Sequence, residues 1–338
     1  MSAAWSIRTV RITALVLCVF GAAVLAWQFV RFLVVFPGPA LLAAALELPL
    51  LVGGFALARL LRPVHAPSLR WSAAALTWGA TAAAGCALLA NRGLISLWAK
   101  GAGTRFAATW SAALSAPLNE EILKLCGVVM VILAAPLVIR GPLDGLIFGA
   151  ITGLGFQAIE NVTYGLNSIV LSGATDPARA VLNSALLRVG TTGLGSHWTM
   201  TAVAGAGVGY LVQSIRAGSW RPRSWRGGAL PALACLATGM AMHLLFDAPA
   251  PAIPIKVVVN LVLVGALYLL LRSAYRSRAR DALAAREAAG LVTRAESEYL
   301  LSRRHRRRRL RSAQSPAERG VLRARQHELL TEVDSEAA

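Results

Sequence analysis

The sequence predicts an all-α fold, a polytopic bundle of transmembrane helices followed by a basic helical tail on the cytoplasmic side. Hydrophobic residues make up 56% of the 338 residues, and the mean hydropathy is +0.59. Apolar runs of about 20 residues recur along the chain, and each is long enough to cross a bilayer. The runs are continuous and lack the alternation of a barrel strand, so helices are the expected way to satisfy the backbone in lipid.

The order of the runs predicts about eight spans, punctuated at their ends by Pro and Gly. They lie near residues 12–36, 40–60, 71–90, 117–139, 143–171, 188–212, 229–247 and 253–271. The less apolar residues 91–116 are expected to form an amphipathic or re-entrant stretch. The chain therefore divides into N-terminal spans with this stretch (1–116), a transmembrane core (117–271) and an Arg-rich tail (272–338).

The net charge of +18 is spread over loops and tail, which argues against nucleic acid as the partner. One set of connections is rich in arginine: Arg8 and Arg11; Arg59, Arg62 and Arg70; Arg140; Arg216, Arg221, Arg223 and Arg226. The positive-inside rule then places both termini in the cytoplasm of a multi-pass protein of the plasma membrane. The basic run 303–309 is typical of a segment attracted to anionic lipid headgroups.

Acidic residues inside the apolar spans are the strongest functional signal. A charge at the middle of a bilayer costs roughly 2.5–3.5 kcal/mol on insertion scales, so such a residue needs a partner, a wet cavity or a function. Four groups combine such residues with polar neighbours: Glu120, Glu121 and Lys124; Glu160 and Asn161; His197; His243 and Asp247.

Each group has a local explanation as well as a chemical one. Adjacent carboxylates at Glu120 and Glu121 disfavour ionising together, so one can accept a proton, but acidic residues also suit the first turn of a helix. Lys124 is one turn away and can pair with either carboxylate. His243 and Asp247 share a helix face, where the carboxylate can fix the imidazole tautomer or simply form a packing pair.

The predicted topology puts all four groups in the outer half of the bilayer. If each group were only a helix-start charge or a packing pair, no shared depth would be expected. Together they suit activation of water, with a carboxylate as base and imidazoles stabilising charge. The same side chains could hold a divalent metal such as zinc, with Glu121, Glu160, His197 and His243 as ligands. The chain has neither an H-E-x-x-H nor a G-x-S-x-G motif.

These motifs resemble the PrsW family of bacterial intramembrane proteases, distant relatives of the type II CAAX prenyl endopeptidases. The resemblance rests on the four groups above in order, with Phe156 before Glu160, Ala116-Pro117, Asp144-Gly145 and Gly153-Leu154-Gly155 beside them. It implies cleavage of a membrane-tethered substrate near the outer face, often an anti-sigma factor in stress signalling. It makes residues 117–271 the catalytic core.

The resemblance also assigns roles. The expected catalytic residues are Glu120, Glu121, His197 and His243, with Lys124, Glu160, Asn161 and Asp247 in support. Glu120 is the expected base. His243 and Asp247 correspond to a His and an Asn near the oxyanion in the CAAX relatives, and Glu160 replaces a His. Apart from the metal, no cofactor is expected.

Two other functions fit parts of the sequence. A scaffold for a partner helix would use Gly149-x-x-x-Gly153 and Gly205-x-x-x-Gly209, although such residues mostly serve internal packing. A transporter would use the carboxylates as a proton relay and would need internal repeats and broken helices. No repeat is evident, but Gly190, Gly193 and Gly195 could interrupt the sixth span.

Overall fold

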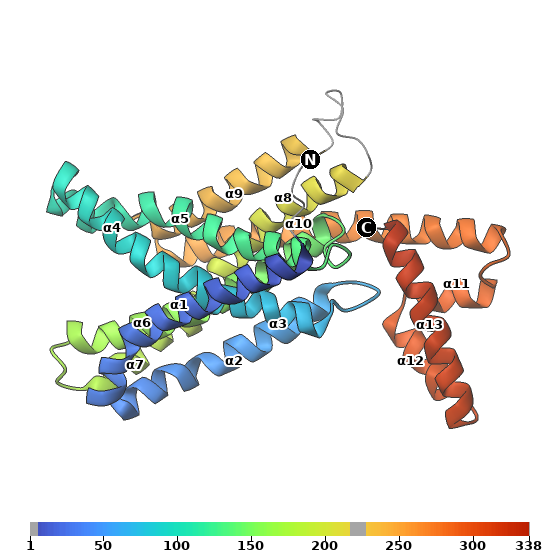
Figure 1. The fold of residues 1–338 in the computed structure, drawn as a ribbon, viewed down its shortest axis with the longest axis horizontal. Helices are drawn as coiled ribbons and strands as arrows, with labels where there is room; N and C mark the ends of the chain where they lie inside the picture. Colours follow the sequence, from blue (N-terminus) through green and yellow to red (C-terminus); the bar gives the residue numbers. More distant parts are fainter. Residues whose placement is uncertain (1–5, 217–227, 338) are drawn as a thin grey trace.

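The computed structural model describes residues 6–216 and 228–337, which form helices and no strand. Most helices run side by side along one axis, and the last ones lie across one end (Figure 1). In chain order the elements are α1 (Ile7–Val35), α2 (Pro37–Leu61), α3 (Leu69–Trp78), the π-helix η1 (Gly79–Ala83), α4 (Ala84–Ala102), α5 (Thr104–Ala134), α6 (Pro142–Leu171), α7 (Pro177–Ala185), the π-helix η2 (Leu186–Thr191), α8 (His197–Arg216), α9 (Ala229–Asp247), α10 (Ile253–Ala288), α11 (Arg294–Leu300), α12 (Arg303–Arg311) and α13 (Pro316–Ala337).

Helix α6 forms the centre of the bundle. In its most apolar stretch 94% of the residues are buried, against 17% in α1 and α2. It packs most extensively on α8, and glycines let the two backbones meet: a Cβ atom at Gly145 would lie 2.2 Å from the carbonyl oxygen of Gly205. Small residues permit this close approach, which places polar side chains of the two helices beside each other.

The outward faces of the outer helices are apolar. Trp27 on α1 is 80% exposed and Val52 on α2 is 65% exposed, which suits a surface in contact with lipid. In the described part of the chain, six helices are long and apolar enough to cross a membrane. They are α1, α2, α3 with η1 and α4, α6, α9 and α10. The chain is therefore a multi-pass membrane protein, and the spanning of α5 and α8 stays a prediction.

The helix that contains the predicted fourth span, 117–139, begins earlier than residue 117. Helix α5 begins at Thr104, directly after Gly103, whose φ of 91° is a conformation that glycine adopts readily. Residues 91–116 are accordingly the end of α4 and the first turns of α5 and form no separate element, whereas their expected amphipathic or re-entrant character stays a prediction. Pro117 lies inside the helix instead of starting it.

The predicted sixth span, 188–212, is interrupted. Its first part belongs to η2, residues 192–196 are non-helical, and α8 begins at His197. Three glycines at positions 190, 193 and 195 fall at this interruption, where their low helix propensity favours a break. His197 is consequently the first residue of a helix rather than a residue in the middle of one.

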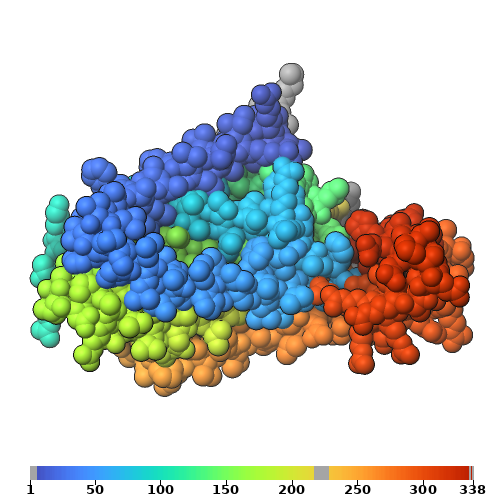
Figure 2. Space-filling model, turned by 90° about the horizontal axis from the view of Figure 1, so that it is seen from below, coloured from blue at the N-terminus to red at the C-terminus, as the bar shows by residue number. Residues whose placement is uncertain are grey.

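The tail is docked on the bundle as a lobe of its own (Figure 2). Helix α10 continues well past the predicted end of the last span, and α13 packs against it. The guanidinium group of Arg303 donates to the carbonyl oxygens of Leu60 and Arg62, and that of Arg306 donates to Val64.

Three of the basic loop residues on which the predicted orientation rests, Arg221, Arg223 and Arg226, lie outside the described residues.

Candidate metal centre

The acidic pair of α5 lies in the middle of that helix and is buried. Glu120 is 2% exposed, and Glu121 and Lys124 are fully buried. The ammonium Nζ of Lys124 lies 2.7 Å from Glu121 Oε1 and 3.5 Å from Glu120 Oε2. The expected pairing of Lys124 is confirmed, and the alternative of a charged first helical turn is excluded by the position of the pair.

Glu120 is held through one of its two oxygens. Its Oε1 accepts a hydrogen bond of 2.8 Å from the amide of Asn91 on α4, and the Asn91 Oδ1 accepts one of 2.6 Å from Asn119. Its Oε2 is buried and has no hydrogen-bond partner among the described residues. Sequence reasoning missed Asn91, whose only signal is an amide beside Arg92 at the end of an apolar run.

His243 on α9 faces this oxygen. The imidazole is fully buried, and its Nδ1 donates to Glu121 Oε1 over 3.0 Å. Its Nε2 lies 3.7 Å from Glu120 Oε2 and 3.4 Å from Asp247 Oδ2, and within the described structure it has no hydrogen-bond partner. Glu121 thus takes the Nδ1 proton of His243, and Asp247 lies beside the other ring nitrogen.

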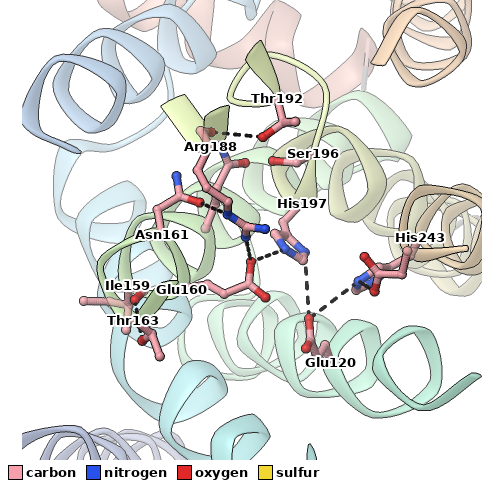
Figure 3. A network of polar contacts seen from close by, with 12 residues as sticks. Glu120, Ile159, Glu160, Asn161, Thr163, Arg188, Thr192, Ser196, His197 and His243 are labelled. Atoms are coloured by element: carbon pink, nitrogen blue, oxygen red, sulfur yellow. Dashed lines mark hydrogen bonds and ion pairs between the residues drawn. The ribbon is translucent and has the colours of Figure 1, made fainter. Parts of the chain in front are cut away.

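His197 lies next to His243 and also faces Glu120 (Figure 3). Its Nε2 lies 2.6 Å from Glu160 Oε2, so the carboxylate accepts the ring proton. Its Nδ1 lies 3.8 Å from Glu120 Oε2 and accepts a hydrogen bond of 3.0 Å from Lys124. The rings of His197 and His243 meet edge to face with centroids 4.9 Å apart.

The turn before His197 is held by two amides that sequence reasoning also missed. Gln157 on α6 donates to the carbonyl oxygen of Gly193 over 2.9 Å, and Asn260 on α10 donates to that of Gly195 over 2.8 Å. Both amides are fully buried. They satisfy backbone groups that the break in the helix leaves free, and so keep His197 in place.

Glu160 is held in turn by Arg188 of η2. The guanidinium Nη2 of Arg188 donates to Glu160, and its Nε donates to Asn161 Oδ1 over 3.0 Å (Figure 3). Asn161 donates its amide to Glu47 on α2, again over 3.0 Å. All eight residues singled out in the sequence therefore belong to one largely buried network, which also includes Glu47 and Arg188.

Three of these side chains could bind one metal ion. Ligand atoms of Glu120, His197 and His243 all lie within 4.8 Å of one another. Each imidazole gives its N–H to a carboxylate and turns its other nitrogen toward Glu120, an arrangement common for metal-binding histidines. Two histidines and one carboxylate form a frequent donor set of catalytic zinc sites.

This set differs from the one expected from the sequence. Glu120 replaces Glu121, because Glu121 is already bonded to Lys124, His243 and Thr201. Glu160 contacts Nε2 of His197, on the side of the ring that does not face Glu120. A metal at Nδ1 of His197 would displace the hydrogen bond from Lys124.

The net charge of the site favours the binding of a cation. The ionisable side chains that contact the three candidate ligands directly or through one other residue are the carboxylates Glu120, Glu121, Glu160 and Asp247 and the cations Lys124 and Arg188. When all of them are ionised and the imidazoles are neutral, the net charge is −2. Uncompensated charge is costly in a buried site, and one divalent cation would balance it.

Comparison with known proteins agrees with this site. The model of the PrsW family of intramembrane metalloproteases matches residues 67–271, well over half of the chain and including every residue of the candidate metal centre. No curated protein and no solved structure matches the chain. The chain belongs to the PrsW family of intramembrane metalloproteases.

Proposed function

We propose that the chain hydrolyses a peptide bond of a membrane-tethered protein at the centre formed by Glu120, His197 and His243. One observation carries the proposal: Glu120 Oε2 and His243 Nε2 are buried without a hydrogen-bond partner in the described structure, and each faces the other. Polar atoms are rarely left this way unless a ligand, a water or an ion completes them. An anti-sigma factor is the kind of substrate that the sequence resemblance suggests.

A divalent metal, with zinc the first candidate, would lower the pKa of a bound water to about 7 and polarise the scissile carbonyl. The protein's own residues prepare that site. Glu160 keeps the proton of His197 on Nε2, and Glu121 keeps that of His243 on Nδ1, so both imidazoles present a lone pair. Lys124 offsets the charge of Glu121 without blocking the Nε2 of His243.

Asp247 is the carboxylate best placed to move protons. It lies 3.4 Å from His243 Nε2, and 23% of its side chain is exposed, whereas Glu120 and Glu121 are buried. It can therefore take a proton from an attacking water and pass it to the leaving amine. In this scheme Glu120 acts as a ligand rather than as the base expected from the sequence.

The charge bias of the loops supports both termini in the cytoplasm and residues 172–180 outside. A cysteine at Ser172, in a background without other cysteines, should then react with an impermeant reagent added outside intact cells. A cysteine at Ser312 should react only after lysis. The opposite pattern would reverse the orientation and move the proposed cleavage to the cytoplasmic side.

The arginines of α12 support contact with anionic headgroups. Arg304, Arg307, Arg308 and Arg311 are exposed, share one helix face, and form no ion pair with any described residue. Anionic lipid should raise the melting temperature of the purified wild type more than that of a variant with these four residues changed to Gln. Equal shifts would exclude the contact.

The function is tested by comparing membrane proteomes. Protein N-termini would be sequenced from cells with the wild type and from cells with Glu120→Gln at equal abundance in the membrane. Fragments of single-span proteins that begin near a membrane boundary should appear only with the wild type. Identical fragments in both strains, under several membrane stresses, would contradict the proposal.

A further inference from the structure

Glu47 is a buried carboxylate that the proposed chemistry does not use. It lies on α2, which precedes the region matched by the family model, and is 5% exposed. A carboxylate inside an apolar span is costly, so a packing role would be served better by an apolar residue. Its contacts instead lead toward the candidate metal centre.

A chain of four contacts joins Glu47 to His197. Glu47 Oε2 accepts from the Asn161 amide over 3.0 Å, and Asn161 Oδ1 accepts from Arg188 Nε, also over 3.0 Å. Arg188 donates through Nη2 to Glu160 Oε2, and this same oxygen lies 2.6 Å from His197 Nε2. Every link is between a donor and an acceptor, and Figure 3 shows the part from Asn161 to His197.

The direction of the Asn161 amide decides whether this chain can form. An amide has a donor end and an acceptor end, and Glu47, which can only accept when ionised, selects the donor end. The acceptor end is thereby turned to Arg188. Asn161 and Glu160 then bind two different nitrogens of one planar guanidinium, which also stacks on Tyr164 with its carbon 3.9 Å from the ring centroid.

We infer that Glu47 is a positioning residue of the site: it orients Asn161, so that Arg188 holds Glu160 against His197. Helix α2 thus completes a centre whose other members lie in the matched region. The effect on His197 follows from contacts alone, whereas an effect on cleavage rests on the proposed function.

Two substitutions separate the hydrogen bond from the charge. Glu47→Leu removes the acceptor, while Glu47→Gln keeps an oxygen that can accept from Asn161. Gln28→Leu is the matched control: Gln28 is also 5% exposed and also accepts hydrogen bonds, from Arg31 and Arg92, which lie outside the site. Its melting temperature measures what the loss of a buried polar group costs elsewhere in the bundle.

The first readout needs neither metal nor activity. The full chain, with its five histidines labelled with nitrogen-15 and its metal removed, is studied by NMR in lipid nanodiscs. In the wild type, Glu47→Gln and Gln28→Leu, the ring proton of His197 should reside on Nε2. In Glu47→Leu the signal of that tautomer should lose intensity or shift, as the contact with Glu160 loosens.

The second readout is cleavage of a substrate found by the proteomic comparison. Loss of a residue that supports a metal ligand typically lowers metal affinity or activity about 10–100-fold. The rate of cleavage by Glu47→Leu should therefore fall by at least about tenfold, and that of Glu47→Gln should stay close to the wild-type rate. An unchanged His197 signal in Glu47→Leu, or Glu47→Gln behaving as Glu47→Leu, would overturn the inference. Normal cleavage by Glu120→Gln would instead overturn the proposed function, and the NMR readout would still decide the role of Glu47.

Discussion

Lys124 lies at the centre of the buried charge. Its ammonium contacts Glu121 and His197 directly and lies 3.5 Å from Glu120, and no part of the side chain reaches the surface. Two adjacent carboxylates inside a helix bundle would repel each other without such a cation. Lys124 therefore stabilises the fold in addition to orienting His197.

We expect Lys124→Met to be strongly destabilising. Removing one partner of a buried ion pair costs about 3–5 kcal/mol, because the other charge remains without compensation. Glu120→Gln should have a much smaller effect, since Glu120 Oε2 has no hydrogen bond in the described structure to lose. Thermal unfolding of both purified variants in one detergent measures the contrast. Equal melting temperatures of the two variants would show that Lys124 does not compensate the charge of the two carboxylates.

At the residue scale, the sequence predicted what lies within one helix. Glu121 with Lys124, and His243 with Asp247, are neighbours because helical spacing puts them on one face. Contacts between different helices could not be predicted from the spacing of residues along one helix. Asn91 on Glu120 and Glu47 on Asn161 join residues that are 29 and 114 positions apart, and a single sequence has no signal for such pairs.

The packing of α6 on α8 determines whether the site assembles. Gly149 meets α8 so closely that a Cβ atom would lie 2.2 Å from the carbonyl oxygen of Thr201, whose hydroxyl donates to Glu121. The glycine pairs that could have served a partner helix therefore pack within the chain. The scaffold reading loses its main support from the sequence.

Gly149→Val should accordingly separate the two helices. Overpacking of this kind costs about 1–3 kcal/mol, and the shift of α8 should also weaken the contact of Thr201 with Glu121. Gly265→Val on α10 is the matched control, because a Cβ atom there meets nothing within 4 Å. Folded yield and melting temperature are the measurements. A Gly149→Val protein as stable as the control would contradict the close packing.

Among the elements, long apolar helices were predicted more reliably than breaks between them. The ranges of α2, α6 and α9 follow from apolar runs bounded by Pro and Gly. The start of α5 was missed because Arg105 and neighbouring polar residues conceal a helix that begins at Thr104. The interruption before His197 had a glycine signal, but the buried amides that stabilise it come from α6 and α10.

Over the whole molecule, a second buried charge cluster fastens the tail to the bundle. Asp334 of α13 lies 2.8 Å from Arg62, at the end of α2, and 2.5 Å from Arg140, before α6. Arg62 also binds Asp144 at the start of α6 over 2.6 Å. The tail was predicted as a helical segment attracted to lipid. Its docking includes a buried ion-pair contact of one acidic residue near the end of the chain, which composition does not reveal.

The docking of the tail should weaken in acid. Burial alone would raise the pKa of Asp334, but Arg62 and Arg140 outweigh it and hold this pKa below its usual range. The docked state is therefore favoured above the ordinary pKa of an aspartate, about 3.9, and loses this contribution as the pH falls toward the depressed value. At neutral pH, Asp334→Asn should have the same effect as acid.

Limited proteolysis of the Arg-rich tail measures this docking. Asp334→Asn should be cut faster than the wild type by trypsin at neutral pH. Glu336→Gln is the control: Glu336 is 45% exposed and pairs with Arg286, and exposed pairs contribute little. Equal cutting of Asp334→Asn and wild type would mean that the cluster does not hold the tail.

The central claim, a metal centre at Glu120, His197 and His243, is tested most directly by counting metal. The purified full chain and its variants are equilibrated with buffered zinc, and bound metal is determined by elemental mass spectrometry. Wild type and His305→Gln, which changes an exposed histidine of the tail, should bind about one ion per chain. His197→Gln and His243→Gln should bind much less. A wild type without tightly bound metal, or histidine variants that bind as much as the wild type, would contradict the claim.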